Sequence, residues 1–263
     1  MAIIGVGKIG EAIARALVDN GYRNVVGTVR TERRKQELSH LPIPIIRDNR
    51  KAASTSEIIF LSVKPTQVAG VLKEIGELLS GKILISVAAA VSTSYIESLA
   101  PGTKVIRAMP NINIVVKSSA TAISPGKNAS KEDVEVARRL FETMGYVVEV
   151  DEKYQDAITA FSGSGPAYML IFFESLLLAG LKVGLPRDVA LELAVNTVTG
   201  TAKLLEKLGK HPAELRDMVI TPGGVTIEAV HVMEREGFRA ILMEAVERAF
   251  KKSEEISKKL NKT

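Results

Sequence analysis

The first 150 residues alternate short β-rich runs with helical stretches, and this alternation limits the folds open to the chain. The runs are apolar throughout, which is typical of strands covered on both sheet faces. Strands separated by helices of this length predict crossover connections and a mostly parallel sheet. The predicted strands are Ala2–Ile4, Asn24–Val29, Ile58–Val63, Lys82–Val87, Lys104–Met109, Ala120–Ile123 and Val147–Val150. The predicted helices between them are Gly10–Asn20, Thr31–Leu38, Thr66–Leu79, Thr93–Leu99 and Lys131–Met144.

From about Asp151 onward the pattern is helical and no further strand is convincing. The helices predicted there are Asp156–Leu181, Pro186–Leu208, Ala213–Val219, Val225–Glu236 and Phe238–Lys259. We therefore expect an α/β fold with two domains. Residues 1–150 would form a mostly parallel sheet with its helices, and residues 151–263 an all-α domain.

One predicted helix is apolar on every side. Residues 165–181 carry only Glu174 and Ser175 as polar interruptions, and the stretch is slightly short for a membrane span. A helix that is apolar all round must be buried all round, and a small helical domain offers little interior for that. We expect burial against a second copy, so the C-terminal domain predicts an interlocked homodimer without a membrane.

Composition excludes several kinds of site. There is no cysteine, which rules out disulfides, thiolate metal sites and cysteine nucleophiles and fits a cytoplasmic location. The first ten residues do not resemble a secretory signal. The net charge is +6 over residues 1–150 and −1 over residues 151–263. Because no basic stripe with interleaved aromatics is present, we expect no nucleic-acid partner and favour a small phosphate-bearing ligand.

A glycine-rich turn opens the chain. Gly5-Val6-Gly7-Lys8-Ile9-Gly10 is a GxGxxG that follows a strand and begins a helix. In this pattern the first glycine permits a tight turn, the second admits a pyrophosphate, and the third lets helix and strand pack closely. The helix start adds free N–H groups and a positive dipole end. The context predicts a dinucleotide-binding Rossmann-type domain, although a glycine turn without a ligand remains the plain alternative.

The end of the second strand selects the cofactor. NAD enzymes usually place an acid about 20 residues after the glycines, where it binds the ribose 2′-hydroxyl. Arg30 stands at that place, and Arg33 and Arg34 follow it. Arginines suit a 2′-phosphate, so we expect NADPH. Glu32 leaves NADH open, because it either serves the 2′-hydroxyl or simply begins a helix.

Six further motifs occur in order along the chain. They are FLSVKPTQV (60–68), SVAAAVS (86–92), IRAMPNIN (106–113), FSGSGPAY (161–168), GLPRDVA (184–190) and VITPGGVTIEAV (219–230). With the glycine turn, they resemble the pyrroline-5-carboxylate reductase family over the whole chain. The resemblance implies reduction of the C=N bond of a small cyclic imino acid by NAD(P)H, the last step of proline biosynthesis. It also implies a Rossmann domain and intertwined dimers of the helical domain, with a decamer of dimers left open.

The resemblance also assigns residues. It implies cofactor contacts at Ile4, Gly5, Val6, Gly7, Lys8, Ile9, Gly10, Thr28, Arg30, Asn49, Ser62, Val63, Lys64, Pro65, Val87, Ala88 and Ala89. Of these, residues 62–65 and 87–89 would lie on the nicotinamide side. It implies substrate contacts at Gly223, Gly224, Val225 and Thr226. The chain departs from the family pattern at residues 112–113 and 220–221, and Met218 puts one cofactor contact in doubt.

The PGGVT stretch itself offers a receptor for an acid. A helix that begins at Val225 has unsatisfied N–H groups at its start, which suit a carboxylate. Thr226 would hydrogen-bond the ring nitrogen as the catalytic residue. The plain alternative is a Pro-Gly-Gly turn with Thr221 as the N-cap. Because an iminium is already electrophilic, no strong general acid and no metal is needed.

Three hypotheses about the function follow. The motif order favours the first, an NADPH-dependent imine reductase that makes proline. The second is a related Rossmann reductase that acts on another cyclic imine or on a hydroxy acid. The third is a non-catalytic NADPH-binding protein. The three histidines, His40, His211 and His231, have no carboxylate at an evident catalytic spacing, so we expect structural roles for them.

Overall fold

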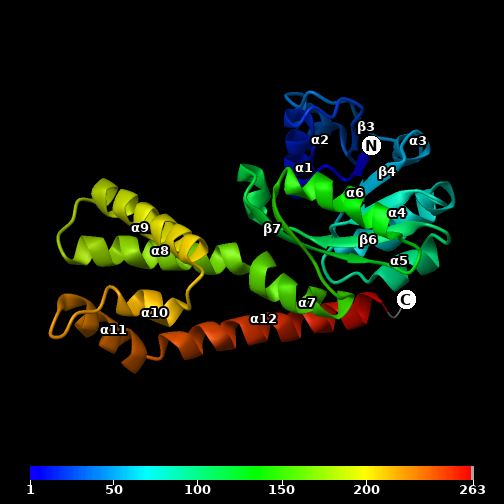
Figure 1. Ribbon diagram of the computed structural model, residues 1–263. Helices are drawn as coiled ribbons and strands as arrows, with labels where there is room; N and C mark the ends of the chain where they lie inside the picture. The colour runs from blue at the N-terminus through cyan, green and yellow to red at the C-terminus, as the bar shows by residue number, and fades with distance from the viewer. Residues whose placement is uncertain (262–263) are drawn as a thin grey trace. The chain divides into compact units, whose positions relative to one another are not determined.

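The computed structural model describes residues 1–261. Contacts within the chain divide it into two compact units. The first unit is Met1–Pro166 together with the segment from Ala249 onward, and the second is Ala167–Arg248. The first unit holds the sheet, and the second is helical throughout (Figure 1).

The sheet has eight strands in the order β3-β2-β1-β4-β5-β6-β7-β8. All neighbouring strands run parallel except the antiparallel pair β6–β7, so the predicted mostly parallel sheet is confirmed. The strands are β1 (Ala2–Ile4), β2 (Val26–Thr28), β3 (Ile45–Ile46), β4 (Ile58–Leu61), β5 (Ile83–Ser86), β6 (Lys104–Met109), β7 (Ser119–Pro125) and β8 (Gly145–Glu149).

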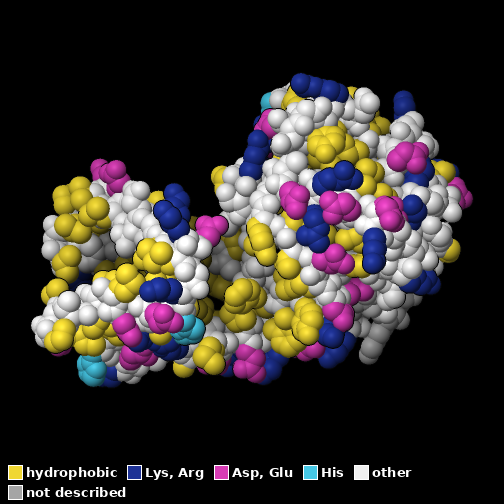
Figure 2. Space-filling model, in the orientation of Figure 1, with side chains coloured by type: hydrophobic (Ala, Val, Ile, Leu, Met, Phe, Trp, Pro, Cys, Tyr) yellow, Lys and Arg dark blue, Asp and Glu magenta, His cyan; other side chains and the backbone are white. Residues whose placement is uncertain are grey.

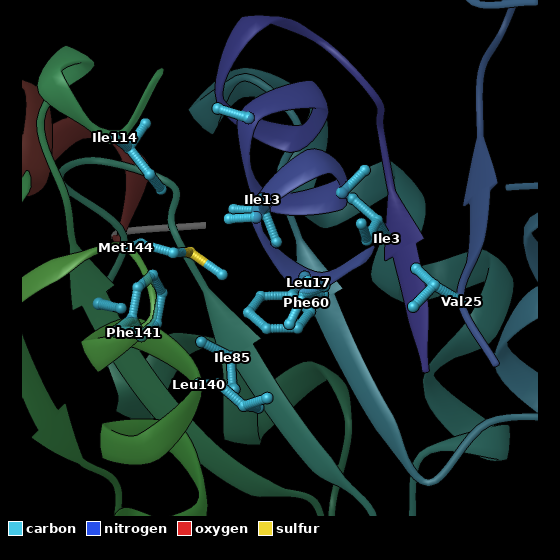
Figure 3. Packing of buried hydrophobic residues seen from close by; sticks show 14 of the residues in the cluster. Ile3, Ile13, Leu17, Val25, Phe60, Ile85, Ile114, Leu140, Phe141 and Met144 are labelled. Atoms are coloured by element: carbon cyan, nitrogen blue, oxygen red, sulfur yellow. The ribbon is translucent and has the colours of Figure 1, made fainter. Parts of the chain in front are cut away.

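Each face of the central strands packs against its own helices. On one face Ile3 and Phe60 meet α1 (Lys8–Asp19) and α6 (Lys131–Glu142), and the rings of Phe60 and Phe141 meet edge to face at 6.1 Å (Figure 3). On the other face neighbouring strand residues such as Ile4 and Leu61 meet α3 (Asn49–Ser54), α4 (Val68–Ile75) and α5 (Thr93–Leu99). Both faces are therefore covered, which explains the uninterrupted apolar runs.

The outer edge of the sheet departs from that pattern. In β8, Tyr146 is 69% exposed and Val148 is 37% exposed. The apolar run of residues 147–150 therefore does not mean that both faces are covered here. Tyr146 and Val148 share one face of the strand, whereas Val147 on the other face is buried, so only one face of β8 is covered.

Several short elements of this unit were not predicted. The two-residue strand β3 and the six-residue helix α3 are too short to show a period. The predicted helix 66–79 is three pieces, η1 (Pro65–Gln67), α4 and η2 (Gly76–Leu78). A 3-10 turn, η3 (Ile112–Val116), follows β6. The short helix α2 (Glu32–Glu37) lies within the predicted helix 31–38, whereas η4 (Glu152–Tyr154) was not predicted.

The predicted helix 156–181 is also interrupted. It consists of α7 (Gln155–Ile158), a π-helical turn η5 (Thr159–Gly163) and α8 (Gly165–Lys182). A π turn frees backbone groups from the usual ladder. The amide Nδ2 of Asn111 donates to the backbone oxygen of Ser162 at 3.1 Å, which ties this turn to the loop after β6.

The second unit contains most of α8, then α9 (Arg187–Leu208), α10 (Pro212–Asp217), α11 (Val225–Arg235) and the start of α12 (Phe238–Leu260). Within α8 the only buried described residue is Leu177. Residues 152–182 are long and apolar enough to cross a membrane by length and composition, and 11% of the most apolar part is buried within the chain. Hydrophobic side chains also lie open over the surface of this unit (Figure 2).

Candidate cofactor and substrate sites

The carboxyl ends of three central strands lie at one edge of the sheet. Ile4 pairs with Leu61, and Leu61 pairs with Ser86. The chain continues these pairings beyond the strands, because Ser62 N donates to Ile4 O at 2.9 Å and Val87 N donates to Leu61 O at 3.1 Å. The strand order reverses at β1, between β2 and β4. Open α/β sheets bind ligands at such a reversal.

The glycine turn has the form that a phosphate loop needs. Gly5 has φ +89°, a conformation that residues with a Cβ rarely adopt. Gly7 is the N-cap of α1 without a side-chain capping bond, and no atom lies within 4 Å of the place where its Cβ would stand. A Cβ on Gly10 would lie 2.8 Å from the oxygen of Gly5, so helix and loop pack closely. The backbone is open at Gly7, as a pyrophosphate requires.

A cavity of about 490 Å³ lies beside this loop. Six of the predicted cofactor residues line it, namely Ile4, Gly5, Thr28, Arg30, Asn49 and Val63. Two hydrogen bonds connect three of these residues, Gly5, Thr28 and Asn49. The hydroxyl of Thr28 accepts from Gly5 N at 3.2 Å and donates to Asn49 Oδ1 at 2.7 Å. Thr28 is buried, so it fixes the loop to the second strand and to α3.

The other predicted cofactor residues do not line this cavity. The turn after β1 holds Val6 and Gly7, and the first residues of α1 are Lys8, Ile9 and Gly10. The segment after β4 holds Ser62, Lys64 and Pro65, and the turn after β5 holds Val87, Ala88 and Ala89. In the turn after β4, Gln67 Oε1 accepts from Lys64 N at 3.3 Å, and Pro65 begins the 3-10 turn. In the turn after β5, Ala90 is left-handed, with φ 63°.

Six residues of the cavity wall were not predicted as cofactor contacts, and the first of them is Val29. The other five are Arg47, Gln67, Gly70, Val71 and Glu74. Arg47 directly follows β3, and it stands 3.8 Å from Glu32 in an ion pair. Because β3 was not predicted, Arg47 could not be placed at this edge from the sequence. Arg30 and Arg47 both line the cavity, so the residues present fit a dinucleotide that carries a 2′-phosphate.

The sequence position of Arg34 suggests a contact with the 2′-phosphate, but its guanidinium bonds other groups of the protein. Its Nε donates to Val6 O at 3.3 Å and its Nη2 donates to Glu11 Oε2 at 2.9 Å. Burial raises the pKa of Glu11, but hydrogen bonds from Arg15, His40 and Arg34 outweigh burial and hold that pKa below its ordinary value. Arg34 therefore braces the glycine turn against α1.

Two interpretations of Glu32 were open, a contact with the ribose 2′-hydroxyl or the start of a helix, and the structure shows the helix start. Glu32 is the first residue of α2, and the hydroxyl of the N-cap residue Thr31 accepts from Arg34 N at 3.3 Å. Glu32 also pairs with Lys35 at 3.6 Å.

The predicted substrate segment forms an open helix start. Gly223 is left-handed with φ +67°, and Gly224 is the N-cap of α11 without a side-chain capping bond. The alternative with Thr221 as the N-cap is therefore wrong; the backbone oxygen of Thr221 instead accepts from Gly224 N at 3.0 Å. Val225 is 89% exposed. The first N–H groups of α11 are thus left without side-chain partners, which suits an anion.

Thr226 also lines a cavity, of about 700 Å³, within the helical unit. Most of its wall is apolar, with Leu204, Leu205 and Phe238 among its residues. At its rim Arg239 Nη2 donates to Glu234 Oε1 at 2.6 Å. Thr226 thus shares this cavity with the polar residues Thr201 and Arg216 as well as with the apolar ones.

Two of the histidines have structural partners. The ring Nε2 of His40 lies 3.2 Å from Glu11 Oε1, and His211 is the N-cap of α10, where its Nδ1 accepts from Ala213 N at 3.2 Å. His231 lies within α11. Within residues 1–261, no group of three or more His, Asp or Glu side chains is placed to hold a metal ion.

Two known sequence families match the chain. The family described as "NADP oxidoreductase coenzyme F420-dependent" matches residues 1–90, and "Pyrroline-5-carboxylate reductase dimerisation" matches residues 152–256. The curated pyrroline-5-carboxylate reductases of Synechocystis and Methanosarcina acetivorans are each 39% identical to the chain, with 98% of both chains covered. The crystal structure of the Plasmodium falciparum pyrroline carboxylate reductase with NADP bound superposes with a TM-score of 0.90 at 28% identity, covering 97% of both chains.

The sheet, its open glycine turn and the two arginines beside the cavity define a Rossmann-type NADP-dependent oxidoreductase. The helical half, with its exposed apolar surface and its match to a dimerisation family, makes it a homo-oligomer. The chain belongs to the pyrroline-5-carboxylate reductase family.

Proposed function

We propose that the helix start Gly223–Thr226 receives the imino acid on which this enzyme acts. The chain is an oxidoreductase of CH–NH bonds that reduces 1-pyrroline-5-carboxylate to L-proline with NADPH, the final step of proline biosynthesis. The observation that supports the site is the glycine N-cap of α11, which leaves the first N–H groups of that helix without side-chain partners.

Two residues of this segment contact the substrate directly. The N–H groups of Val225 and Thr226 hold the substrate carboxylate, and the positive end of the helix dipole adds about 0.3–1 kcal/mol, more where the site is shielded from water. The hydroxyl of Thr226 hydrogen-bonds the ring nitrogen and fixes the orientation of the C=N bond. Orientation of two reactants supplies on the order of 7–11 kcal/mol, which reduces the need for an acid catalyst.

The cofactor is held by the first unit. The glycine turn 5–10 receives the pyrophosphate, and Thr28, Arg30 and Asn49 receive the adenosine ribose. The turns at residues 62–65 and 87–89 hold the nicotinamide half. When bound, NADPH supplies a hydride for the carbon of the C=N bond.

The assembly extends this proposal. We assign cofactor binding to residues 1–150, and substrate binding and dimerisation to residues 151–263. The apolar surface of α8 is covered by a second copy in a dimer, rather than by a membrane, and dimers can associate further into a decamer. The enzyme works in the cytoplasm.

The test of the function is the fall of NADPH absorbance after pyrroline-5-carboxylate is added to the purified chain. We expect steady oxidation that depends on the imino acid, with proline as the product. A panel of hydroxy acids and of larger cyclic imines should give little turnover. Tight NADPH binding without any oxidation would favour the non-catalytic alternative instead.

The two arginines of the cavity should set the preference for NADPH. We expect Arg47→Gln to raise the KM for NADPH about tenfold while the KM for NADH stays unchanged, because each charge-assisted bond to the 2′-phosphate contributes about 1.5–3 kcal/mol. Arg30→Glu should shift the preference further toward NADH. Arg33→Gln is the matched control, since the Arg33 side chain is 90% exposed and pairs with Glu37. An unchanged NADPH-to-NADH ratio in both cavity variants would remove these contacts.

A further inference from the structure

The turn after β5 is held by a residue from the far end of the chain. Asn261 directly follows α12, 171 residues beyond Ala90, and its Nδ2 donates to Ala90 O at 3.2 Å. Its Oδ1 accepts from Ser92 N at 3.1 Å and from Ser92 Oγ at 3.1 Å. One side-chain amide therefore uses both its donor and its acceptor on the same short turn.

The backbone is strained at Ala90, the residue whose carbonyl Asn261 bonds. Ala90 has φ 63°, a left-handed conformation that residues with a Cβ avoid. Strained backbone of this kind persists only where its surroundings hold it, and it gathers at functional sites. Because Asn261 bonds the carbonyl of Ala90 and the amide of Ser92, it holds the chain on both sides of Val91.

Asn261 is itself held in place by hydrogen bonds to Ser257 of α12. Its Nδ2 also donates to Ser257 O at 2.7 Å and to Ser257 Oγ at 3.1 Å, and its backbone N donates to Ser257 O at 3.0 Å. The preceding Leu260 packs against the same buried cluster that contains Ala88 and Val91. The end of α12 is thus a rigid support beside the turn.

We propose that Asn261 is a positioning residue that holds the turn 87–92 in the conformation that receives the nicotinamide half of the cofactor. The inference rests on the proposed function, which places residues 87–89 on the nicotinamide side. Asn261 acts through Ala90 and Ser92, and it leaves the binding of the adenosine half, at the other end of the cofactor, to the cavity beside Thr28.

The test compares two ligands by calorimetry. Asn261→Ala should weaken NADPH binding about tenfold, the loss expected for hydrogen bonds to the turn. It should leave the affinity for 2′-phospho-ADP-ribose, which has no nicotinamide, within about twofold of the unsubstituted protein. Equal weakening of both ligands would show a general loss of structure, and unchanged NADPH binding would show that the turn does not need Asn261. Either result overturns the proposal.

Two further variants keep the test decisive. Asn196→Ala is the matched control, because the Nδ2 of Asn196 donates to Glu192 O at 2.9 Å, four residues back, as that of Asn261 does to Ser257. It should change neither affinity. Ser257→Ala removes one support of Asn261 and should weaken NADPH binding by a smaller factor in the same direction. Binding is measured without turnover, so a wild-type protein that binds NADPH but reduces no imine would refute the proposed function and not this inference.

Discussion

Replacement of Gly5 by alanine is expected to abolish useful NADPH binding. A Cβ at this position would stand 2.5 Å from Val63 Cγ1 and 3.1 Å from Ser62 O, and φ would have to remain at +89°. The left-handed backbone costs about 1–2 kcal/mol with a Cβ, and overpacking adds about 1–3 kcal/mol. The turn should relieve this strain by moving, and the NADPH affinity should then fall at least about a hundredfold. Calorimetric titration with NADPH measures the loss.

Gly21→Ala separates backbone strain from loss of the site. Gly21 has φ +87°, and no atom lies within 4 Å of the place where its Cβ would stand. This control should lower the free energy of unfolding by about 1–2 kcal/mol and leave NADPH affinity unchanged. If Gly21→Ala weakened NADPH binding as much as Gly5→Ala, the special role of the Gly5 turn would be refuted.

The second large effect is expected at Thr226. Thr226→Val keeps the shape of the side chain but removes the hydroxyl, and Thr226→Ala removes the hydroxyl and a methyl group. A hydrogen bond to a charged group contributes about 1.5–3 kcal/mol, so both variants should reduce kcat/KM for pyrroline-5-carboxylate about 10- to 100-fold. The Kd for NADPH should stay unchanged, because the cofactor is held by other residues.

Thr226→Ser tests whether the hydroxyl is the cause. It keeps the oxygen, so it should retain most of the activity that the alanine and valine variants lose. A slow serine variant beside an active valine variant would assign the effect to packing in the cavity that Thr226 also lines. A loss of NADPH affinity in the alanine variant would contradict the assigned role of Thr226.

Elements with strong local patterns could be predicted from the sequence. The predicted bounds of Ala2–Ile4, Thr93–Leu99 and Lys104–Met109 are the observed ones. Buried strands carry continuous apolar runs, and α5 begins at an N-cap, Ser92, whose side chain accepts from Tyr95 N. The helix start at Val225 was predicted for the same kind of reason, because the two preceding glycines end the regular backbone.

Features that depend on distant partners could not be predicted. Strand β3 has two residues and forms because Gly27 and Thr28 pair with it. Without β3 the place of Arg47 beside the cavity is not visible in the sequence. The π turn at residues 159–163 is bonded by Asn111, which lies 51 residues from Ser162 in the sequence. Asn261 bonds Ala90 across 171 residues. Local sequence carries no signal for either contact.

The most direct test of the account is a structure of the enzyme with proline and NADP bound. In that structure the proline carboxylate should accept hydrogen bonds from the backbone N–H groups of Val225 and Thr226. The ring nitrogen of proline should lie within hydrogen-bond distance of the Thr226 hydroxyl. Proline bound elsewhere, with Gly223–Thr226 making no contact to it, would contradict the account.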